Sequence, residues 1–365
     1  MLKRIHYTNS RFFVIPGLGF LILLIAWPQS LSTLIMVLLG FVLVATVFSA
    51  VHHAEVIALR VGEPFGSLIL ALAVTIIEVG MILVLVLQSP DTTENLARDT
   101  VFAAVMITTN GIVGLSLLIK AIRQRLATFN AYGVGGALAT LVALSTLTLV
   151  LPTFTTSSPG PTFTTWQLIF AAIVSLVLYL TFVGVQTVRH RDYFLPPPRE
   201  DDTIPLQEHV EPPSRSQSLL SLVGLFISLV TVVGLAKVTS PLIQGFVDEF
   251  GLPQMVVAIS IALVVLLPES ISAFKAARYG RTQTSLNLAY GSALASIGLT
   301  IPAMAVISVL FSYKVNLGLN PSEIVLLALT FIVSTLTLFS GRATLLQGVI
   351  HLSIFGTFVM FAITP

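Results

Sequence analysis

The stretch Gly62–Gln88, GEPFGSLILALAVTIIEVGMILVLVLQ, decides the fold. From Phe65 to Gln88 it is almost wholly apolar and long enough to cross a bilayer, which takes about 20 apolar residues. Its one ionisable residue, Glu78, lies close to the middle. A charged side chain at that depth costs at least about 2.5 kcal/mol, so a membrane helix that keeps one is expected to use it. A second apolar segment, Val256–Arg278, carries Glu269 in the same way.

The composition excludes a protein that is dissolved in water. Of 365 residues, 55% are hydrophobic and 9% are charged, whereas soluble domains carry about 25% charged residues. The apolar segments are too long for the strands of a membrane barrel, in which apolar and polar residues alternate over about 10 residues. We therefore predict an all-α polytopic membrane protein with 11 transmembrane helices. The segments are 12–28, 31–58, 65–88, 99–122, 131–151, 164–187, 219–243, 253–278, 284–311, 321–339 and 343–364.

Lys and Arg are distributed unevenly over the loops, and this sets the orientation. With the amino terminus in the cytoplasm, only Arg98, Lys237 and Lys314 of the 18 lie on the outer side. This uneven distribution supports the number of crossings and places the carboxyl terminus outside. The expected location is the plasma (inner) membrane of a prokaryote. The inner residues are Lys3, Arg4, Arg11, Arg60, Lys120, Arg123, Arg125, Arg189, Arg191, Arg199, Arg215, Lys275, Arg278, Arg281 and Arg342.

One long polar stretch divides the chain. Its prolines and charges indicate an extended cytoplasmic linker, whose acidic cluster either senses a divalent cation or is a solvated tether. We expect an N-terminal helix in 1–30, a five-helix repeat in 31–188, the acidic Pro-rich linker in 189–218 and a second repeat in 219–365. Because five crossings reverse direction, the two repeats are inverted, as in many transporters. The acidic residues are Glu200, Asp201, Asp202, Glu208 and Glu211.

Glu78 and Glu269 occupy matching positions of the two expected repeats. Two carboxylates that meet suit a metal cation, which needs oxygen ligands and charge compensation. Without the cation they do not both stay ionised, because desolvation and mutual repulsion raise the pKa of each carboxyl. Protons then replace the cation, and this competition is the basis of an antiporter. The alternative is that each is a protonated acid that only links neighbouring helices.

Further polar groups lie on the same and neighbouring segments. Pro268 precedes Glu269 and frees the carbonyl four residues back, which either binds a cation at a helix break or only accompanies a packing kink. Thr75 lies one turn before Glu78 on the same face. Small and hydroxylated residues in the fourth and ninth segments serve either close helix packing or ligation. Among these, the amide of Asn110 is the group that we expect to bind a cation.

Histidines lie near the ends of two segments. His52, His53 and Glu55 are candidates for a proton path to the cytoplasm, and an interfacial polar cap is the alternative. His351 and Gln347 share a face of the last helix, and we expect them to be packing residues. The motifs of soluble enzymes and of nucleic-acid binding do not occur, and no cofactor is expected.

The stretches GEPFGSLILALAVTIIEV, TTNGIVG, LLPES, AYGSALASIGLTIP and SGRATLLQG resemble the ChaA-type proteins of the cation/proton exchanger branch, within the calcium/cation antiporter superfamily. The resemblance runs over nearly the whole chain. It implies a Ca²⁺/H⁺ antiporter with one helix plus two inverted five-helix repeats, in which the glutamates correspond to Glu78 and Glu269. It also implies a role for Thr109 with Asn110, and for Gly291 with Ser292.

The chain departs from that pattern beside both glutamates. Calcium exchangers of the wider branch carry a Gly-Asn pair there, whereas this chain has Val74-Thr75 and Leu266-Leu267. Exchange of Na⁺ or K⁺ for protons is therefore the alternative to Ca²⁺/H⁺ exchange. A membrane-embedded enzyme acting on lipid and a passive channel are two further alternatives. The expected partners are membrane lipid and the transported cations.

Overall fold

The computed structural model describes residues 11–27, 31–63, 65–88, 93–195, 212–311 and 313–364. The acidic residues of the linker lie outside these ranges, as do Lys3, Arg4 and Arg199. Over the described residues the chain forms long helices, several of them extended by short π or 3-10 turns, and two very short strands. Their bounds are α1 Arg11–Ala26, α2 Thr33–Val61, α3 Phe65–Gln88, α4 Leu96–Met106, η2 Ile107–Ile112, α5 Val113–Gln124, β1 Ala127–Thr128, α6 Ala131–Ser145, η3 Thr146–Val150, α7 Leu151–Phe154, α8 Thr165–Gly184, η4 Val185–Arg189, η5 Arg191–Phe194, α9 Arg215–Glu249, α10 Met255–Arg278, α11 Thr282–Phe311, α12 Pro321–Phe339, β2 Arg342–Ala343 and α13 Leu345–Ile363.

The helices confirm an all-α polytopic membrane protein. In the described part of the chain, 10 helical runs are long and apolar enough to cross a membrane, and α1 is an eleventh, shorter apolar helix. Each run coincides with an expected segment to within a few residues, except α9, which extends beyond 219–243 at both ends. Large apolar side chains cover the outer faces of the helices; Phe41 and Phe339, for example, are 71% and 87% exposed. Such faces suit lipid, and soluble monomers rarely carry them in contiguous patches.

The stretch from Gly62 onward forms a tight turn between α2 and α3. Gly62 has a φ of 78°, which L side chains rarely adopt, and its N–H bonds to the Ala58 carbonyl at 2.9 Å. A Cβ on Gly66 would lie 2.6 Å from the Ala58 carbonyl oxygen, so only glycine allows the two helices to approach this closely. The turn therefore fixes where α3 begins, and with it the depth of Glu78.

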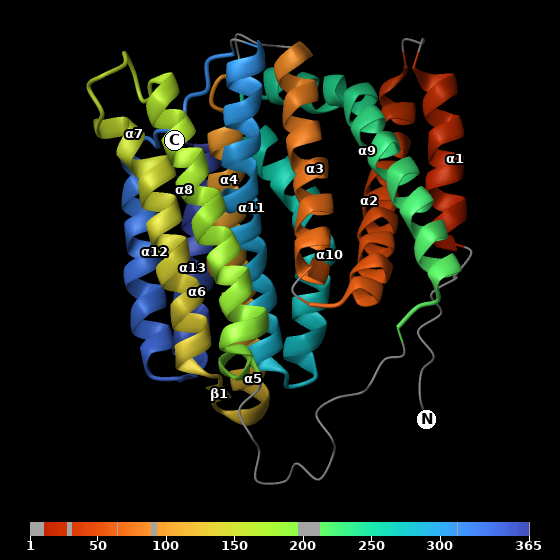
Figure 1. The fold of residues 1–365 in the computed structure, drawn as a ribbon. Helices are drawn as coiled ribbons and strands as arrows, with labels where there is room; N and C mark the ends of the chain where they lie inside the picture. Colours follow the sequence, from red (N-terminus) through yellow and green to blue (C-terminus); the bar gives the residue numbers. More distant parts are fainter. Residues whose placement is uncertain are drawn as a thin grey trace. The chain divides into compact units, whose positions relative to one another are not determined.

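The chain folds as two compact units that do not follow the repeats. The first comprises Met1–Gln88 and Arg199–Phe250, and the second comprises Ser89–Pro198 and Gly251–Pro365. In the first unit α2 packs against α9 and α3, and α1 packs against α2 and α9 (Figure 1). The first unit thus combines the N-terminal helix with the first two helices of one expected repeat and the first helix of the other.

In the second unit, α10 packs against α4 and α11, and α13 packs against α5. The strands β1 and β2 pair in antiparallel fashion, with Ala127 opposite Ala343, and join the α5–α6 turn to the α12–α13 turn. Glycines allow the closest helix contacts. A Cβ on Gly348 of α13 would lie 2.8 Å from the backbone nitrogen of Leu118 of α5, and a Cβ on Gly114 would lie 2.9 Å from the Cβ of His351.

We expect Gly348→Ala to destabilise the protein, because the added Cβ meets backbone atoms, and overpacking of this kind costs about 1–3 kcal/mol. Gly356→Ala in the same helix is the matched control. A Cβ there meets nothing within 4 Å, so the variant should only gain helix propensity, about 0.5–1 kcal/mol. The midpoint of thermal unfolding in detergent measures both. Equal midpoints for the two variants would show that α5 and α13 are not packed this closely.

Candidate functional site

Glu78 lies in the middle of α3, in the first unit. It is the fourteenth of 24 residues of the helix and is 2% exposed. Thr75, one turn earlier, is 5% exposed, and its hydroxyl has no hydrogen-bond partner among the described residues. A Cβ on Gly80 would lie 2.6 Å from a methyl group of Val233, so the glycine allows α9 to pack close to this turn. The helix therefore holds a carboxyl and a hydroxyl oxygen together on one face.

Glu269 holds the corresponding place in α10, in the second unit. It is the fifteenth of 24 residues and is half-buried. The helix runs without interruption through Pro268, so the expected helix break is not present. Because proline has no N–H, it removes only the bond that the Val264 carbonyl would otherwise accept. Glu78 and Glu269 are carried by different compact units, and their meeting at one cation site stays a prediction.

The fourth crossing contains a π-helical turn where the sequence interrupts its apolar run. This turn, η2, joins α4 to α5, and the Val113 N–H bonds to the carbonyls of Thr108 and Asn110 rather than to that of Thr109. The Thr109 hydroxyl bonds back to the Val105 carbonyl at 2.5 Å. Such turns insert one residue into a helix and are frequent at functional sites.

The side chain of Asn110 lies in a buried hydrogen-bond network with α12 and α13. Its Nδ2 donates to the Thr330 hydroxyl at 2.9 Å, and its Oδ1 lies 3.0 Å from Nδ1 of His351. Nε2 of His351 in turn lies 3.2 Å from the Thr337 hydroxyl. Both ends of the amide are therefore engaged within the second unit. The expectation that His351 and Gln347 are packing residues is wrong. His351 is hydrogen-bonded to Asn110, and Gln347 caps α13 by accepting from the Thr344 N–H at 2.8 Å.

Hydroxyl groups line one face of α11. Ser292 is half-buried, Ser296 and Thr300 are buried, and the Thr300 hydroxyl has no hydrogen-bond partner in the ranges that the structure describes. The same helix contacts α5 through a 2.6 Å hydrogen bond between the hydroxyls of Ser116 and Ser285. Ser292 thus lies on a polar face in the same unit as Glu269, and its binding of a cation stays a prediction.

The histidines of α2 contact α1 and α9. His53 is buried, and its Nε2 donates to the Phe12 carbonyl at 2.9 Å. The ring of His52 stacks on that of Phe12 at a centroid distance of 3.8 Å. A Cβ on Gly224 of α9 would lie 2.5 Å from Nε2 of His53, so this glycine makes room for the ring. Glu55, three residues after His52, is exposed, and a proton path through these three residues stays a prediction.

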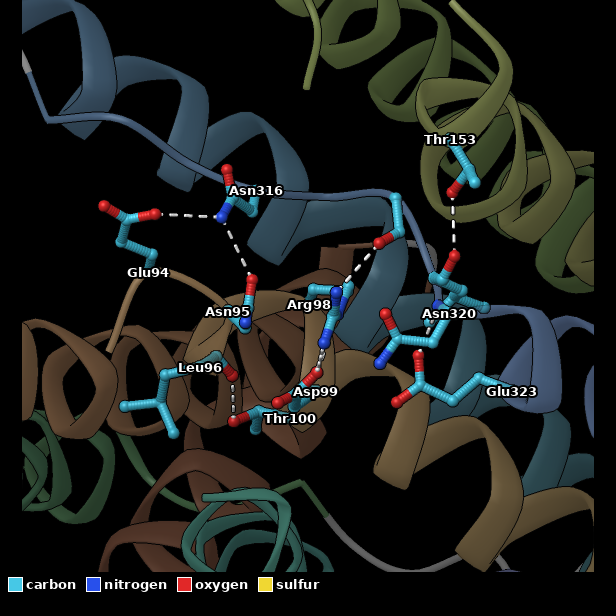
Figure 2. A network of polar contacts seen from close by, with 12 residues as sticks. Glu94, Asn95, Leu96, Arg98, Asp99, Thr100, Thr153, Asn316, Asn320 and Glu323 are labelled. Carbon is cyan, nitrogen blue, oxygen red and sulfur yellow. Dashed lines mark hydrogen bonds and ion pairs between the residues drawn. The ribbon is translucent and has the colours of Figure 1, made fainter. Parts of the chain in front are cut away.

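A second polar network, not predicted from the sequence, lies where α4 and α12 begin. Figure 2 shows Arg98 between the carboxylate of Asp99, 2.7 Å away, and the Gly318 carbonyl, 2.9 Å away. Asp99 is 4% exposed and lies in the first turn of α4, where the helix dipole favours an anion. Glu323 also lies in the first turn of its helix, α12, and its carboxylate accepts from the Asn320 N–H at 2.8 Å. These groups line a cavity of about 240 Å³.

The composition of the site limits what can hold a metal ion. Within the described ranges, no three His, Asp or Glu residues gather as a metal cluster. Two carboxylates do not complete the ligands of a cation, so hydroxyl and main-chain oxygens would have to supply the rest.

The model of the sodium/calcium exchanger protein family matches the chain twice, over residues 31–188 and 220–364. The putative ionic transporter y4hA of Sinorhizobium fredii (strain NBRC 101917 / NGR234) is 46% identical over 92% of this chain and 90% of its own. The sodium-potassium/proton antiporter ChaA of Escherichia coli (strain K12) is 31% identical over 98% of this chain and 97% of its own.

Among solved structures, the fold is similar to that of native YfkE, with a TM-score of 0.73 at 16% identity over 97% of this chain and 100% of the other. The H⁺/Ca²⁺ exchanger CAX gives a TM-score of 0.71 at 16% identity over 97% of this chain and 89% of its own. These likenesses concern the fold.

We expect Asp99→Asn to destabilise the second unit strongly. The substitution leaves the buried guanidinium of Arg98 without its anion, and a buried charge that loses its partner costs about 3–5 kcal/mol. Asp248→Asn, an exposed residue near the end of α9, is the control and should change stability by about 0.5 kcal/mol or less. Thermal unfolding of both variants in detergent gives the comparison, and similar midpoints would contradict a buried ion pair.

Proposed function

The chain belongs to the sodium/calcium exchanger protein family, and from this membership we propose that it exports Ca²⁺ in exchange for protons by alternating access, with Glu78 and Glu269 as the exchange site. It is a secondary transporter of the exchanger type and not an enzyme. The observation that carries the proposal is that each repeat buries or half-buries one acid at the middle of its second helix, 13 and 14 residues after the helix begins.

The physical argument is competition for a common charge. Two carboxylates balance the charge of one Ca²⁺, and in an apolar environment the pair is stable either with the cation or with protons. Thr75 and Ser292 are proposed to add neutral oxygens. With either the cation or protons bound the site is neutral, and the protein can change at low cost from facing one side of the membrane to facing the other. With neither bound the site is charged, and the same change is costly. This difference couples the two fluxes.

A second candidate cargo is a monovalent cation. It is favoured by the similarity, over nearly the full chain, to a sodium-potassium/proton antiporter, and by Val74-Thr75 and Leu266-Leu267 beside the acids. The engagement of the Asn110 amide with His351 and Thr330 also leaves fewer neutral oxygens for a cation. Na⁺ and K⁺ carry one charge instead of two and need less compensation than Ca²⁺, so the same two acids would also suffice to bind a monovalent cation.

The amino terminus is proposed to lie in the cytoplasm. Basic residues of the second unit support this, because they gather at one end of it: Lys120 donates to the Gly280 carbonyl at 3.1 Å, and Arg123 donates to the Arg278 carbonyl at 2.8 Å. Arg342 of β2 is held at that end by its pairing with β1. An excess of Lys and Arg marks the cytoplasmic side.

We expect Glu78→Gln and Glu269→Gln each to lower proton-coupled cation flux by about 10- to 150-fold, because contacts to a charged group are worth about 1.5–3 kcal/mol. Uptake of Ca²⁺, Na⁺ or K⁺ from the medium into everted vesicles, measured for each cation separately, provides the assay, with the proton gradient imposed and then collapsed. Glu249→Gln, at the exposed end of α9, should keep the wild-type flux. Flux that survives in both glutamine variants rejects the mechanism, and flux that ignores the gradient indicates a channel.

Single cysteines test the orientation, since the chain has none of its own. Gln124→Cys and Ser157→Cys change exposed residues on opposite sides of the crossing Ala131–Phe154. In intact cells a membrane-impermeant maleimide should label the cysteine at 157 and not that at 124, while a permeant reagent labels both. The reverse pattern would place the amino terminus outside.

A further inference from the structure

The network around Asn110 contains a buried histidine that the exchange described above does not use. His351 and Asn110 have no exposed surface, and their hydrogen-bond partners come from α4, η2, α12 and α13, all in the second unit. The glycines at positions 114 and 348 bring α5 and α13 close enough for the imidazole to reach the amide. The contact is thus built into the helix packing.

The hydrogen atoms of the network can be assigned by donor and acceptor chemistry. The Thr330 hydroxyl donates to the Leu326 carbonyl at 2.8 Å, so it accepts from Asn110 and fixes Nδ2 of the amide on its side. Oδ1 of Asn110 then faces Nδ1 of His351, and because an amide oxygen only accepts, Nδ1 carries the proton. Nε2 is left as the acceptor for the Thr337 hydroxyl. The neutral Nδ1–H tautomer satisfies all four groups.

The amide so held belongs to the π-helical turn of the fourth crossing. This turn packs against α12 and α13 on the side of the network, and it also contacts α10 and α11, which carry Glu269 and Ser292. A π-helical turn relaxes to an ordinary α-helical turn unless its surroundings hold it. The bonds from Asn110 to two neighbouring helices supply that hold.

We propose that His351 is a positioning residue of cation exchange: by donating from Nδ1 to Asn110 it holds the turn Ile107–Ile112 in its π-helical form beside α10 and α11. The proposal rests on the proposed function for its effect on transport. Its structural part, the tautomer, stands without it. Asn110 accordingly acts through the turn, and its amide oxygen is occupied by the imidazole rather than by the cation.

The tautomer is tested by ¹⁵N NMR of protein labelled at histidine and purified in detergent. The chain has six histidines, and His351→Asn identifies the pair of ring signals that belongs to residue 351. We expect Nδ1 with a bound hydrogen and Nε2 with the shift of an unprotonated acceptor. The opposite assignment, or a doubly protonated ring at neutral pH, overturns the proposal.

Two amide substitutions separate the two ring nitrogens. The side-chain nitrogen of asparagine lies as many bonds from the backbone as Nδ1 and donates as it does, and the side-chain oxygen of glutamine lies as many bonds away as Nε2 and accepts as it does. His351→Asn therefore keeps the donor to Asn110, whereas His351→Gln keeps only the contact with Thr337. We expect the KM for the cation to stay within about threefold in His351→Asn and to rise about 10-fold or more in His351→Gln, since the latter leaves a buried acceptor unpaired.

The alternatives give different results. A packing role leaves both variants alike in KM, and a role as carrier of the transported proton abolishes proton coupling in both, because neither amide titrates; either result overturns the proposal. Thermal midpoints of both variants, measured in the same detergent, confirm that each is folded. A wild-type protein without any cation/proton flux would overturn the proposed function instead, and the NMR result would be unaffected by it.

Discussion

A polar group inside the apolar part of this protein has to find its partner within the protein, because lipid offers no hydrogen bonds. This constraint explains why polar side chains bond to segments that are distant in sequence. Asn110 is bonded to residues 220 and 241 positions away, and the guanidinium of Arg98 to a carbonyl 220 positions away. The bonds of Asn110 tie the fourth crossing to α12 and α13, and the bond of Arg98 ties it to the loop that precedes α12. The arrangement of the second unit is therefore specified by a few polar contacts set within a large apolar surface that by itself favours many packings.

The same constraint gives the two mid-helix acids their chemistry. A carboxylate at half depth is costly unless its charge is balanced, and the balance is supplied either by a bound cation or by a proton. The neighbours of Glu78 fit this alternation. Thr75 presents a buried hydroxyl that is not bonded back to its own helix. In contrast, the hydroxyls of Thr46 and Thr231 donate to the carbonyls four residues earlier in their helices. A hydroxyl in that state is available as a neutral ligand in one condition and as a partner of the protonated acid in the other.

Much of the fold was predictable from the sequence, and less of the site was. The helix positions follow from the lengths of the apolar segments, and Glu78 and Glu269 stand out because a charge at mid-helix is rare. The π-helical turn was not predictable, since it depends on bonds from Asn110 to residues on helices more than 200 positions later. The ion pair of Arg98 with Asp99 was not predicted, because adjacent charges at a helix end have the same sequence pattern whether they are exposed to solvent or buried. The break expected at Pro268 is absent because the rest of α10 keeps its helical bonds around one missing N–H.

The contact between Asn110 and His351 bears on which cation the protein selects. An amide oxygen is a good ligand for a hard cation such as Ca²⁺, which takes six to eight oxygens. Here that oxygen accepts from an imidazole N–H, and a group cannot give the same lone pairs to a cation at no cost. The second unit then offers a carboxylate, hydroxyls and main-chain carbonyls, a set poorer in neutral side-chain oxygens than the residue types alone indicate. With the ligand number reduced and the charge of the acids unchanged, the balance between Ca²⁺ and a monovalent cation depends on how many main-chain oxygens the helices release. The turn Ile107–Ile112, which His351 holds in its π-helical form, is one place where main-chain carbonyls depart from regular α-helical bonding.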